Sequence, residues 1–208
     1  MTRIAVIDYG VGNLRSVEKA FAVLGVDALV SNEEKALMAA DALVLPGVGA
    51  FGKCMKELRV RGFDRLVSNR AREGVPILGV CVGMQMLFEE SEEFGSNEGL
   101  GLMRGYVRRF ADSTLVPHVG WNQVSIRGRH SLLENIPDES FFYFVHSYYC
   151  ESSDSSVVIG ETDYARTYPS VVAQKNIYGV QFHPEKSQAA GLKLMANFAG
   201  ISSTKNVS

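Results

Sequence analysis

Three side chains with the chemistry of a nucleophilic catalyst stand in two short motifs that lie far apart in the sequence. Cys81 lies in Gly79-Val80-Cys81-Val82-Gly83, and the other two lie in His183-Pro184-Glu185. A nucleophile, a base and an acid that orients the base are the three parts of a catalytic triad. The residue types therefore predict covalent catalysis by Cys81, His183 and Glu185, provided that the fold brings the two motifs together.

The segment around Cys81 is typical of a nucleophile elbow, a sharp turn from a strand into a helix. An apolar run precedes Cys81, and Met84, Leu87 and Phe88 follow it at helical spacing. Flanking glycines allow other backbone to approach closely, and a helix N-terminus favours the nucleophilic thiolate. A buried structural cysteine is the alternative. The glycines and the downstream His-Pro-Glu motif favour the nucleophile.

The second motif follows a strand-like run over residues 178–182. In an extended chain, residues two apart point to the same side, so His183 and Glu185 can project together, and Pro184 stiffens the link. A surface pair and a metal-binding pair are the alternatives. A metal site needs a third ligand, and none stands at ligand spacing nearby. We therefore expect neither a metal nor a cofactor.

The composition is that of a compact globular enzyme. The chain has 208 residues, of which 46% are hydrophobic, and a net charge of −2, which gives no electrostatic sign of nucleic-acid binding. Three widely spaced cysteines argue against a disulfide framework and for a reducing compartment. No apolar segment resembles a signal peptide or a membrane span, so we expect a cytoplasmic location and no membrane partner.

The order of predicted elements indicates an α/β fold with a mostly parallel, doubly wound sheet flanked by helices. Buried strands are predicted at residues 4–7, 28–30, 42–45 and 77–80, and helices at residues 17–24 and 50–73. The second half is strand-rich and should add antiparallel strands, at residues 106–110, 124–126, 141–145, 157–159, 171–173 and 177–182. A last helix over residues 188–199 completes a single domain, residues 1–200, before a polar tail at residues 201–208.

The motifs resemble those of the class I (triad-type) glutamine amidotransferases, and the resemblance spans residues 4–199. The segment from Gly79 to Gln85 and the His-Pro-Glu motif are similar to the two hallmark motifs of that family, in the same order. Pro46-Gly47-Val48-Gly49 resembles its oxyanion strand. Val82 departs from the family, which more often has Leu, but the backbone N–H acts at that position.

Three further segments resemble the glutaminase subunits of imidazole glycerol phosphate synthases, which serve histidine biosynthesis: residues 8–14, 117–122 and 143–149. This resemblance implies hydrolysis of L-glutamine through a cysteine thioester. It also implies a heterodimer with a (β/α)8-barrel cyclase subunit, which uses the ammonia to make imidazole glycerol phosphate and an aminoimidazole carboxamide ribotide. The alternatives are a glutaminase subunit for pyridoxal phosphate or anthranilate synthesis, and a non-catalytic regulatory protein on the same scaffold.

The family resemblance also implies which residues bind glutamine. Backbone N–H groups would hold the oxyanion and side chains would hold the substrate, with these residues involved: Val48, Gly49, Val82, Gln85, Glu93, His146, Ser147 and Tyr148. Two of them have a plain alternative. Gln85 could face solvent on its helix, and Glu93 lies in an acidic run that could be a solvated face.

Four residues are expected to contact the cyclase, by resemblance: Asn13, Trp121, Tyr143 and Lys186. The Gly10-Val11-Gly12-Asn13 turn lacks the further glycine of a dinucleotide loop, because Arg15 stands in its place. Turn-forming residues around Trp121 predict a loop that enters a strand. Packing in the core is the alternative for this tryptophan.

Overall fold

A nine-stranded sheet runs through the computed structural model, which describes residues 3–111 and 115–204. Five parallel strands come first, in the order β2 (Ala28–Ser31), β1 (Ile4–Ile7), β3 (Ala42–Gly47), β4 (Ile77–Cys81) and β13 (Ile177–Val180). Four antiparallel strands continue the sheet, in the order β12 (Thr167–Gln174), β11 (Val158–Asp163), β8 (His118–Ile126) and β9 (Ser140–His146). The expected parallel sheet with added antiparallel strands is confirmed.

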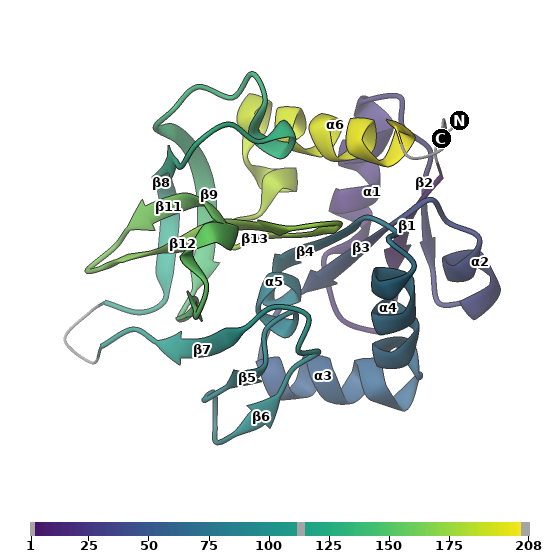
Figure 1. Cartoon of the computed structure of the whole chain (residues 1–208), viewed down its shortest axis with the longest axis horizontal. Helices are drawn as coiled ribbons and strands as arrows, with labels where there is room; N and C mark the ends of the chain where they lie inside the picture. The colour runs from purple at the N-terminus through teal and green to yellow at the C-terminus, as the bar shows by residue number, and fades with distance from the viewer. Residues whose placement is uncertain (1–2, 112–114, 205–208) are drawn as a thin grey trace.

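Helices lie on both faces of the parallel strands (Figure 1). On one face lie α1 (Leu14–Val23) and α6 (Gln188–Thr204); on the other lie α3 (Phe51–Val60), α4 (Phe63–Arg72) and α5 (Val82–Met86), with α2 (Glu34–Met38) beside α4. Helix α1 buries Val17, Ala20 and Phe21, which recur at the three- and four-residue spacing of one helix face. The expected doubly wound arrangement is therefore confirmed.

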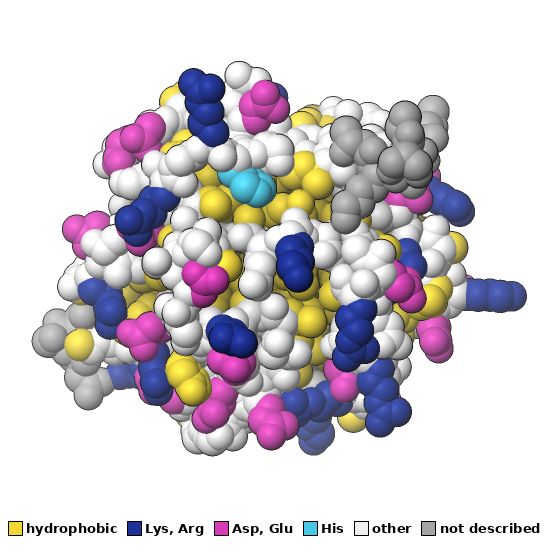
Figure 2. Space-filling model, viewed as in Figure 1, with side chains coloured by type: hydrophobic (Ala, Val, Ile, Leu, Met, Phe, Trp, Pro, Cys, Tyr) yellow, Lys and Arg dark blue, Asp and Glu magenta, His cyan; other side chains and the backbone are white. Residues whose placement is uncertain are grey.

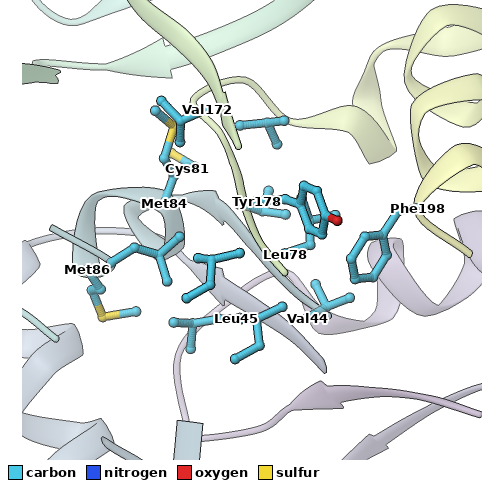
Figure 3. Close-up of a cluster of buried hydrophobic side chains, with 14 of the residues drawn as sticks. Val44, Leu45, Leu78, Cys81, Met84, Met86, Val172, Tyr178 and Phe198 are labelled. Atoms are coloured by element: carbon cyan, nitrogen blue, oxygen red, sulfur yellow. The ribbon is translucent and has the colours of Figure 1, made fainter. Parts of the chain in front are cut away.

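The central strands are buried along their whole length, because helices cover them on both sides. Figure 3 shows the part of this core around Cys81, which includes Leu45, Leu78, Met84 and Val172. The nucleophile thus stands on a closely packed base.

A second, four-stranded sheet lies beside the first, as the strand-rich second half predicts. Its order is β10 (Tyr148–Ser152), β7 (Gly105–Arg109), β5 (Glu90–Ser91) and β6 (Asn97–Glu98). Three 3₁₀ turns complete the elements: η1 (Ser131–Leu133), η2 (Ser155–Val157) and η3 (Pro184–Lys186). Strand β10 follows β9 after a single residue, Ser147, so the chain passes from one sheet to the other there.

Two sequence-based expectations are wrong. Helix α6 continues to Thr204, because the hydroxyls of Ser202 and Ser203 donate to carbonyls four residues earlier and so remain satisfied inside the helix. The expected end of this helix at residue 199 is therefore wrong, and residues 205–208 lie outside the described part of the chain. Trp121 lies within β8, opposite Tyr143 of β9, and not on a loop entering a strand.

Charged side chains of both signs are interspersed on the face shown in Figure 2, in keeping with the small net charge of −2. Within residues 3–111 and 115–204, no helix combines the length and the apolar character needed to cross a membrane.

Candidate active site

Cys81 occupies a strained turn between β4 and α5. Its φ of 56° and ψ of −115° are unusual for a residue with a side chain. The flanking glycines are required by close packing. A Cβ on Gly79 would lie 2.6 Å from the carbonyl oxygen of Gly83, and a Cβ on Gly83 would overlap the carbonyl oxygen of Leu45. The predicted elbow is confirmed as a backbone conformation.

His183 and Glu185 lie just beyond β13, the neighbour of β4 in the sheet. Nδ1 of His183 is 2.9 Å from Oε1 of Glu185, and both side chains are buried. Burial lowers the pKa of His183, but hydrogen bonding and charge interaction with Cys81 and Glu185 outweigh it and raise the pKa to about 10. His183 is therefore an imidazolium at neutral pH, and its positive charge lies beside the Cys81 sulfur.

A cavity of about 250 Å³ opens next to Cys81 and His183. All eight residues expected to bind substrate line it: Val48, Gly49, Val82, Gln85, Glu93, His146, Ser147 and Tyr148. Pro117 and Val145 complete the wall. A larger cavity of about 740 Å³ is lined by residues of the 126–138 segment and includes no member of the triad. Chemistry, and not volume, therefore identifies the candidate site.

The family model for class-I glutamine amidotransferases matches residues 5–200. The chain belongs to the class-I glutamine amidotransferase family. It is 47% identical, over 207 residues, to the imidazole glycerol phosphate synthase subunit HisH of Salinibacter ruber, covering 96% of this chain and 95% of that protein. It is 49% identical to the same-named subunit of Desulfitobacterium hafniense, covering 94% of this chain and 92% of that protein.

Solved structures share the fold of this amidotransferase. One glutamine amidotransferase superposes with a TM-score of 0.76 at 21% identity, covering 96% of this chain and 98% of that one. A glutamine amidotransferase of Thermotoga maritima superposes with a TM-score of 0.65 at 16% identity, covering 100% of this chain and 86% of that one. At these identities the likeness concerns the fold alone.

Gln85 and Glu93 of this amidotransferase are not free surface side chains. Gln85 is buried, and its Nε2 donates to the Tyr148 carbonyl at 3.0 Å and to Oε1 of Gln181 at 3.2 Å. Glu93 accepts from the backbone N–H of Phe51 at 2.5 Å, at the start of α3. Burial raises the pKa of Glu93, and the Phe51 bond lowers it in part. The solvent-exposed alternative is therefore wrong for Gln85, whereas Glu93 is half-buried.

His146 lines the cavity, and protein groups lie within hydrogen-bond distance of both of its ring nitrogens. Nδ1 lies 2.8 Å from the Tyr148 carbonyl, and Nε2 lies 3.1 Å from the Tyr168 hydroxyl and 3.2 Å from Nδ1 of His118. Burial lowers the pKa of His146 to about 3 and that of His118 to about 4, so both rings are neutral. Both ring nitrogens of His146 are thus engaged by protein groups at the cavity wall.

The protonation of this pair follows from its partners. The Tyr148 carbonyl can only accept, which assigns the proton of His146 to Nδ1 and leaves Nε2 as an acceptor. Nε2 of His118 lies 3.4 Å from the amide nitrogen of Asn122, which assigns the His118 proton to Nδ1. The His118 ring also stacks on Tyr164, with centroids 3.9 Å apart. This buried network holds the Tyr148 carbonyl, a part of the cavity wall, in place.

Gln181 is a site residue that the sequence analysis did not single out. Its side chain is fully buried, and its Nε2 lies 3.8 Å from the sulfur of Cys81. Its Oε1 accepts from Gln85. The available signal was a polar residue two positions before His183 in an otherwise apolar strand run, since residues two apart share a side. Among the described residues, no group of three His, Cys, Asp or Glu side chains is placed to hold a metal ion.

Three of the four expected interface residues form one surface cluster, which we call the aromatic cluster: Trp121, Tyr143 and Lys186. The rings of Trp121 and Tyr143 meet edge to face at 6.0 Å, and Nζ of Lys186 lies 5.8 Å from the Tyr143 ring centre. Trp121 is 46% exposed, so its core alternative is wrong. The Tyr143 carbonyl accepts from the backbone N–H of His183 at 2.9 Å, so the cluster adjoins the triad.

Asn13 stands apart from the aromatic cluster, at the start of α1, where its Oδ1 accepts from the Ser16 hydroxyl at 2.9 Å. Apolar side chains extend the cluster along the same face of β8 and β9. Val119 is 56% exposed and Phe141 is 54% exposed, on alternate residues of their strands. The face is apolar enough to mark an interaction surface.

Proposed function

We propose that the chain is the glutaminase subunit of an imidazole glycerol phosphate synthase, in histidine biosynthesis. Membership of the class-I glutamine amidotransferases supports an enzyme that takes nitrogen from glutamine. Relatives at 47% and 49% identity that carry the name of this synthase subunit support the pathway. The observation that carries the proposal is the set Cys81, His183 and Glu185, held together beside one cavity.

In the first step, the Cys81 sulfur attacks the side-chain amide carbon of L-glutamine and forms a C–S bond. His183 gives its proton to the departing nitrogen, and ammonia leaves as the C–N bond breaks. Glu185 accepts from Nδ1 of His183, which keeps Nε2 directed at the reacting atoms and stabilises the imidazolium. The products of this step are the glutamyl thioester and ammonia.

The negative charge of the tetrahedral intermediate falls on the former amide oxygen. We assign its stabilisation to the backbone N–H of Val82, at the start of α5, and to the Val48–Gly49 segment across the cavity. The loss of one such donor typically costs about 10²–10³ in rate. Gln181 adds a further N–H beside the sulfur.

Water then attacks the thioester carbon. His183, neutral after giving up its proton, takes the water proton, and the C–S bond breaks to release glutamate. The sulfur and the imidazolium return to their starting charges, so the cycle needs no oxidant and no cofactor.

The ammonia requires a receiving subunit, because free ammonia is protonated in water at neutral pH. We propose a (β/α)8-barrel cyclase subunit that converts it into imidazole glycerol phosphate and an aminoimidazole carboxamide ribotide. The exposed aromatic cluster beside the triad supports docking on that face. Asn13, at the start of α1, is proposed as a further contact.

Replacement of the nucleophile tests the proposal. Cys81→Ala in the complex with the cyclase should abolish synthesis from glutamine, while synthesis from added ammonium salt persists. Cys150→Ala is the matched control, because Cys150 is also a buried free thiol. Glutamine hydrolysis by Cys81→Ala at the wild-type rate would refute the assignment of the nucleophile.

The same preparation discriminates the alternatives. A non-catalytic regulatory protein would not be labelled at Cys81 by a thiol-reactive glutamine analogue. A glutaminase of another pathway would be labelled, but it would not form a complex with this cyclase. The relatives at 47–49% identity do not favour either alternative.

A further inference from the structure

The Pro46–Gly49 segment, which runs from the end of β3 into the oxyanion turn at Val48 and Gly49, is held by two buried side chains. The Tyr9 hydroxyl donates to the Pro46 carbonyl at 2.6 Å. The Cys54 thiol donates to the Val48 carbonyl at 3.4 Å. Both side chains are fully buried, and neither lines the cavity beside Cys81.

Both groups keep the protons that these bonds need. Burial raises the pKa of Tyr9 far above its ordinary value, and burial also raises the pKa of the Cys54 thiol. A carbonyl has no proton to give, so the direction of each bond is fixed. Tyr9 and Cys54 are donors throughout the neutral pH range.

Each bond fixes the orientation of a whole peptide group. In a trans peptide the C=O and N–H lie on opposite edges of one plane. With the Val48 carbonyl directed at Cys54 of α3, the N–H of Gly49 points away from that helix. With the Pro46 carbonyl directed at Tyr9, the N–H of Gly47 likewise points away from it.

These orientations matter because carbonyl oxygens carry partial negative charge. Val48 and Gly49 line the cavity together with Cys81, where the proposed oxyanion forms. A carbonyl turned into that space would repel the developing charge, whereas an N–H would stabilise it. The bond from Cys54 keeps the Val48 carbonyl out of it, and the bond from Tyr9 fixes the Pro46 carbonyl in β3, directly before the cavity-lining residues.

The turn needs such restraint because of its own composition. Glycines flank Val48 on both sides. Gly47 is fixed in the ladder opposite Cys81, but Gly49 adopts a φ of +85°, and nothing would lie within 4 Å of a Cβ at that position. Glycine leaves many backbone conformations accessible, so the turn alone would not select one. Side-chain donors from the loop after β1 and from α3 supply the selection.

We propose that Tyr9 and Cys54 are positioning residues of the oxyanion turn, which act through the Pro46 and Val48 carbonyls and never touch the substrate. The inference rests on the proposed glutaminase function. It predicts that loss of either donor lowers the rate of thioester chemistry and leaves the affinity for glutamine nearly unchanged, because the proposed N–H donors act on the negative charge that develops only in the transition state.

The test uses pairs of variants that differ in one donor, assayed as glutamine hydrolysis by the complex with the cyclase. Tyr9→Phe and Cys54→Ala should each lower kcat about five- to tenfold, the effect of one hydrogen bond, with KM within about twofold. Cys54→Ser restores a donor and should return kcat to within about twofold of wild type. Tyr178→Phe, which removes a buried hydroxyl bonded to the Lys175 carbonyl, should leave both constants unchanged.

Two controls separate the possible failures. Synthesis from ammonium salt by each variant complex reports folding and assembly, and should match wild type. If Cys81→Ala retained glutamine hydrolysis, the proposed function would fail. If Cys81→Ala were inactive while Tyr9→Phe and Cys54→Ala kept the wild-type kcat, the positioning role alone would be overturned. A Cys54→Ser variant as slow as Cys54→Ala would also overturn it, because packing and not donation would then be responsible.

Discussion

Glu185→Gln removes the charge that holds His183 protonated while keeping the size of the side chain. Nδ1 of His183 lies 2.9 Å from Oε1 of Glu185, which corresponds to an attraction of about 6 kcal/mol at an effective dielectric constant of 20. The amide retains one hydrogen bond, worth about 1 kcal/mol. A net loss of about 5 kcal/mol in the stabilisation of the imidazolium predicts a fall in kcat of roughly 5,000-fold.

The pH profile gives a second measure of the same loss. Glu185 is one of the two groups that raise the pKa of His183, so its replacement lowers that pKa and removes imidazolium at neutral pH. Steady-state glutaminase rates of the complex, measured from pH 6 to 9, should show the activity limit moving to lower pH. His183→Ala should lose more activity than Glu185→Gln, because it removes the proton carrier itself. A Glu185→Gln rate within tenfold of wild type, with an unchanged profile, would refute this account of the pair.

Three further predictions concern residues around the triad. His146→Asn, whose amide can replace Nδ1 at the Tyr148 carbonyl, should keep KM for glutamine, whereas His146→Gln should raise it about tenfold; equal KM values would contradict the positioning role. Because the pKa values of His118 and His146 are lowered in the folded state, the unfolded state binds more protons. The free energy of unfolding is therefore highest above pH 6.5 and decreases as the pH falls toward 4. At pH 5, each histidine lowers the free energy of unfolding by about 2 kcal/mol. Denaturant titrations at several pH values should show this dependence of the free energy of unfolding on pH, and His118→Gln should reduce it. An unchanged dependence in His118→Gln would contradict the lowered pKa of His118. Trp121→Ala should weaken association with the cyclase by about 2 kcal/mol and leave the melting temperature of the isolated chain close to wild type, since the ring is 46% exposed; calorimetric titration and thermal melts would distinguish this from a loss of folding.

The sequence predicts the parallel half of the fold because its signals are local. Continuous apolar runs at β1, β3 and β4 alternate with helical patterns, and this alternation has few solutions other than a doubly wound sheet. The elbow can likewise be predicted from a short stretch of sequence, because Gly79 and Gly83, which its packing requires, lie within two residues of Cys81.

The remaining features depend on contacts between segments that no local pattern records. His118 meets His146 because β8 pairs with β9 in one register, and Tyr168 joins them from β12. Turn-forming residues near Trp121 suggested a loop, but the ladder to β9 holds Gly120 at a φ of +135° inside a strand. Propensity is a weak guide where such pairing decides the backbone.

One packing arrangement brings the two motifs together although they lie far apart in the sequence: helix α5 packs against strands β4 and β13. Gly79 of β4 and Gly179 of β13 lie opposite each other in the parallel ladder, and Met84 of α5 covers both. A Cβ on Gly179 would lie 2.7 Å from Cγ of Met84, and a Cβ on Gly79 would lie 2.8 Å from its Cα. The helix that follows the nucleophile is therefore seated directly on the strand that carries the base. Both glycines allow α5 to pack this closely on the sheet, and this close packing sets the geometry between Cys81 and His183. A side chain at position 179 would therefore shift the nucleophile relative to the base without touching either residue.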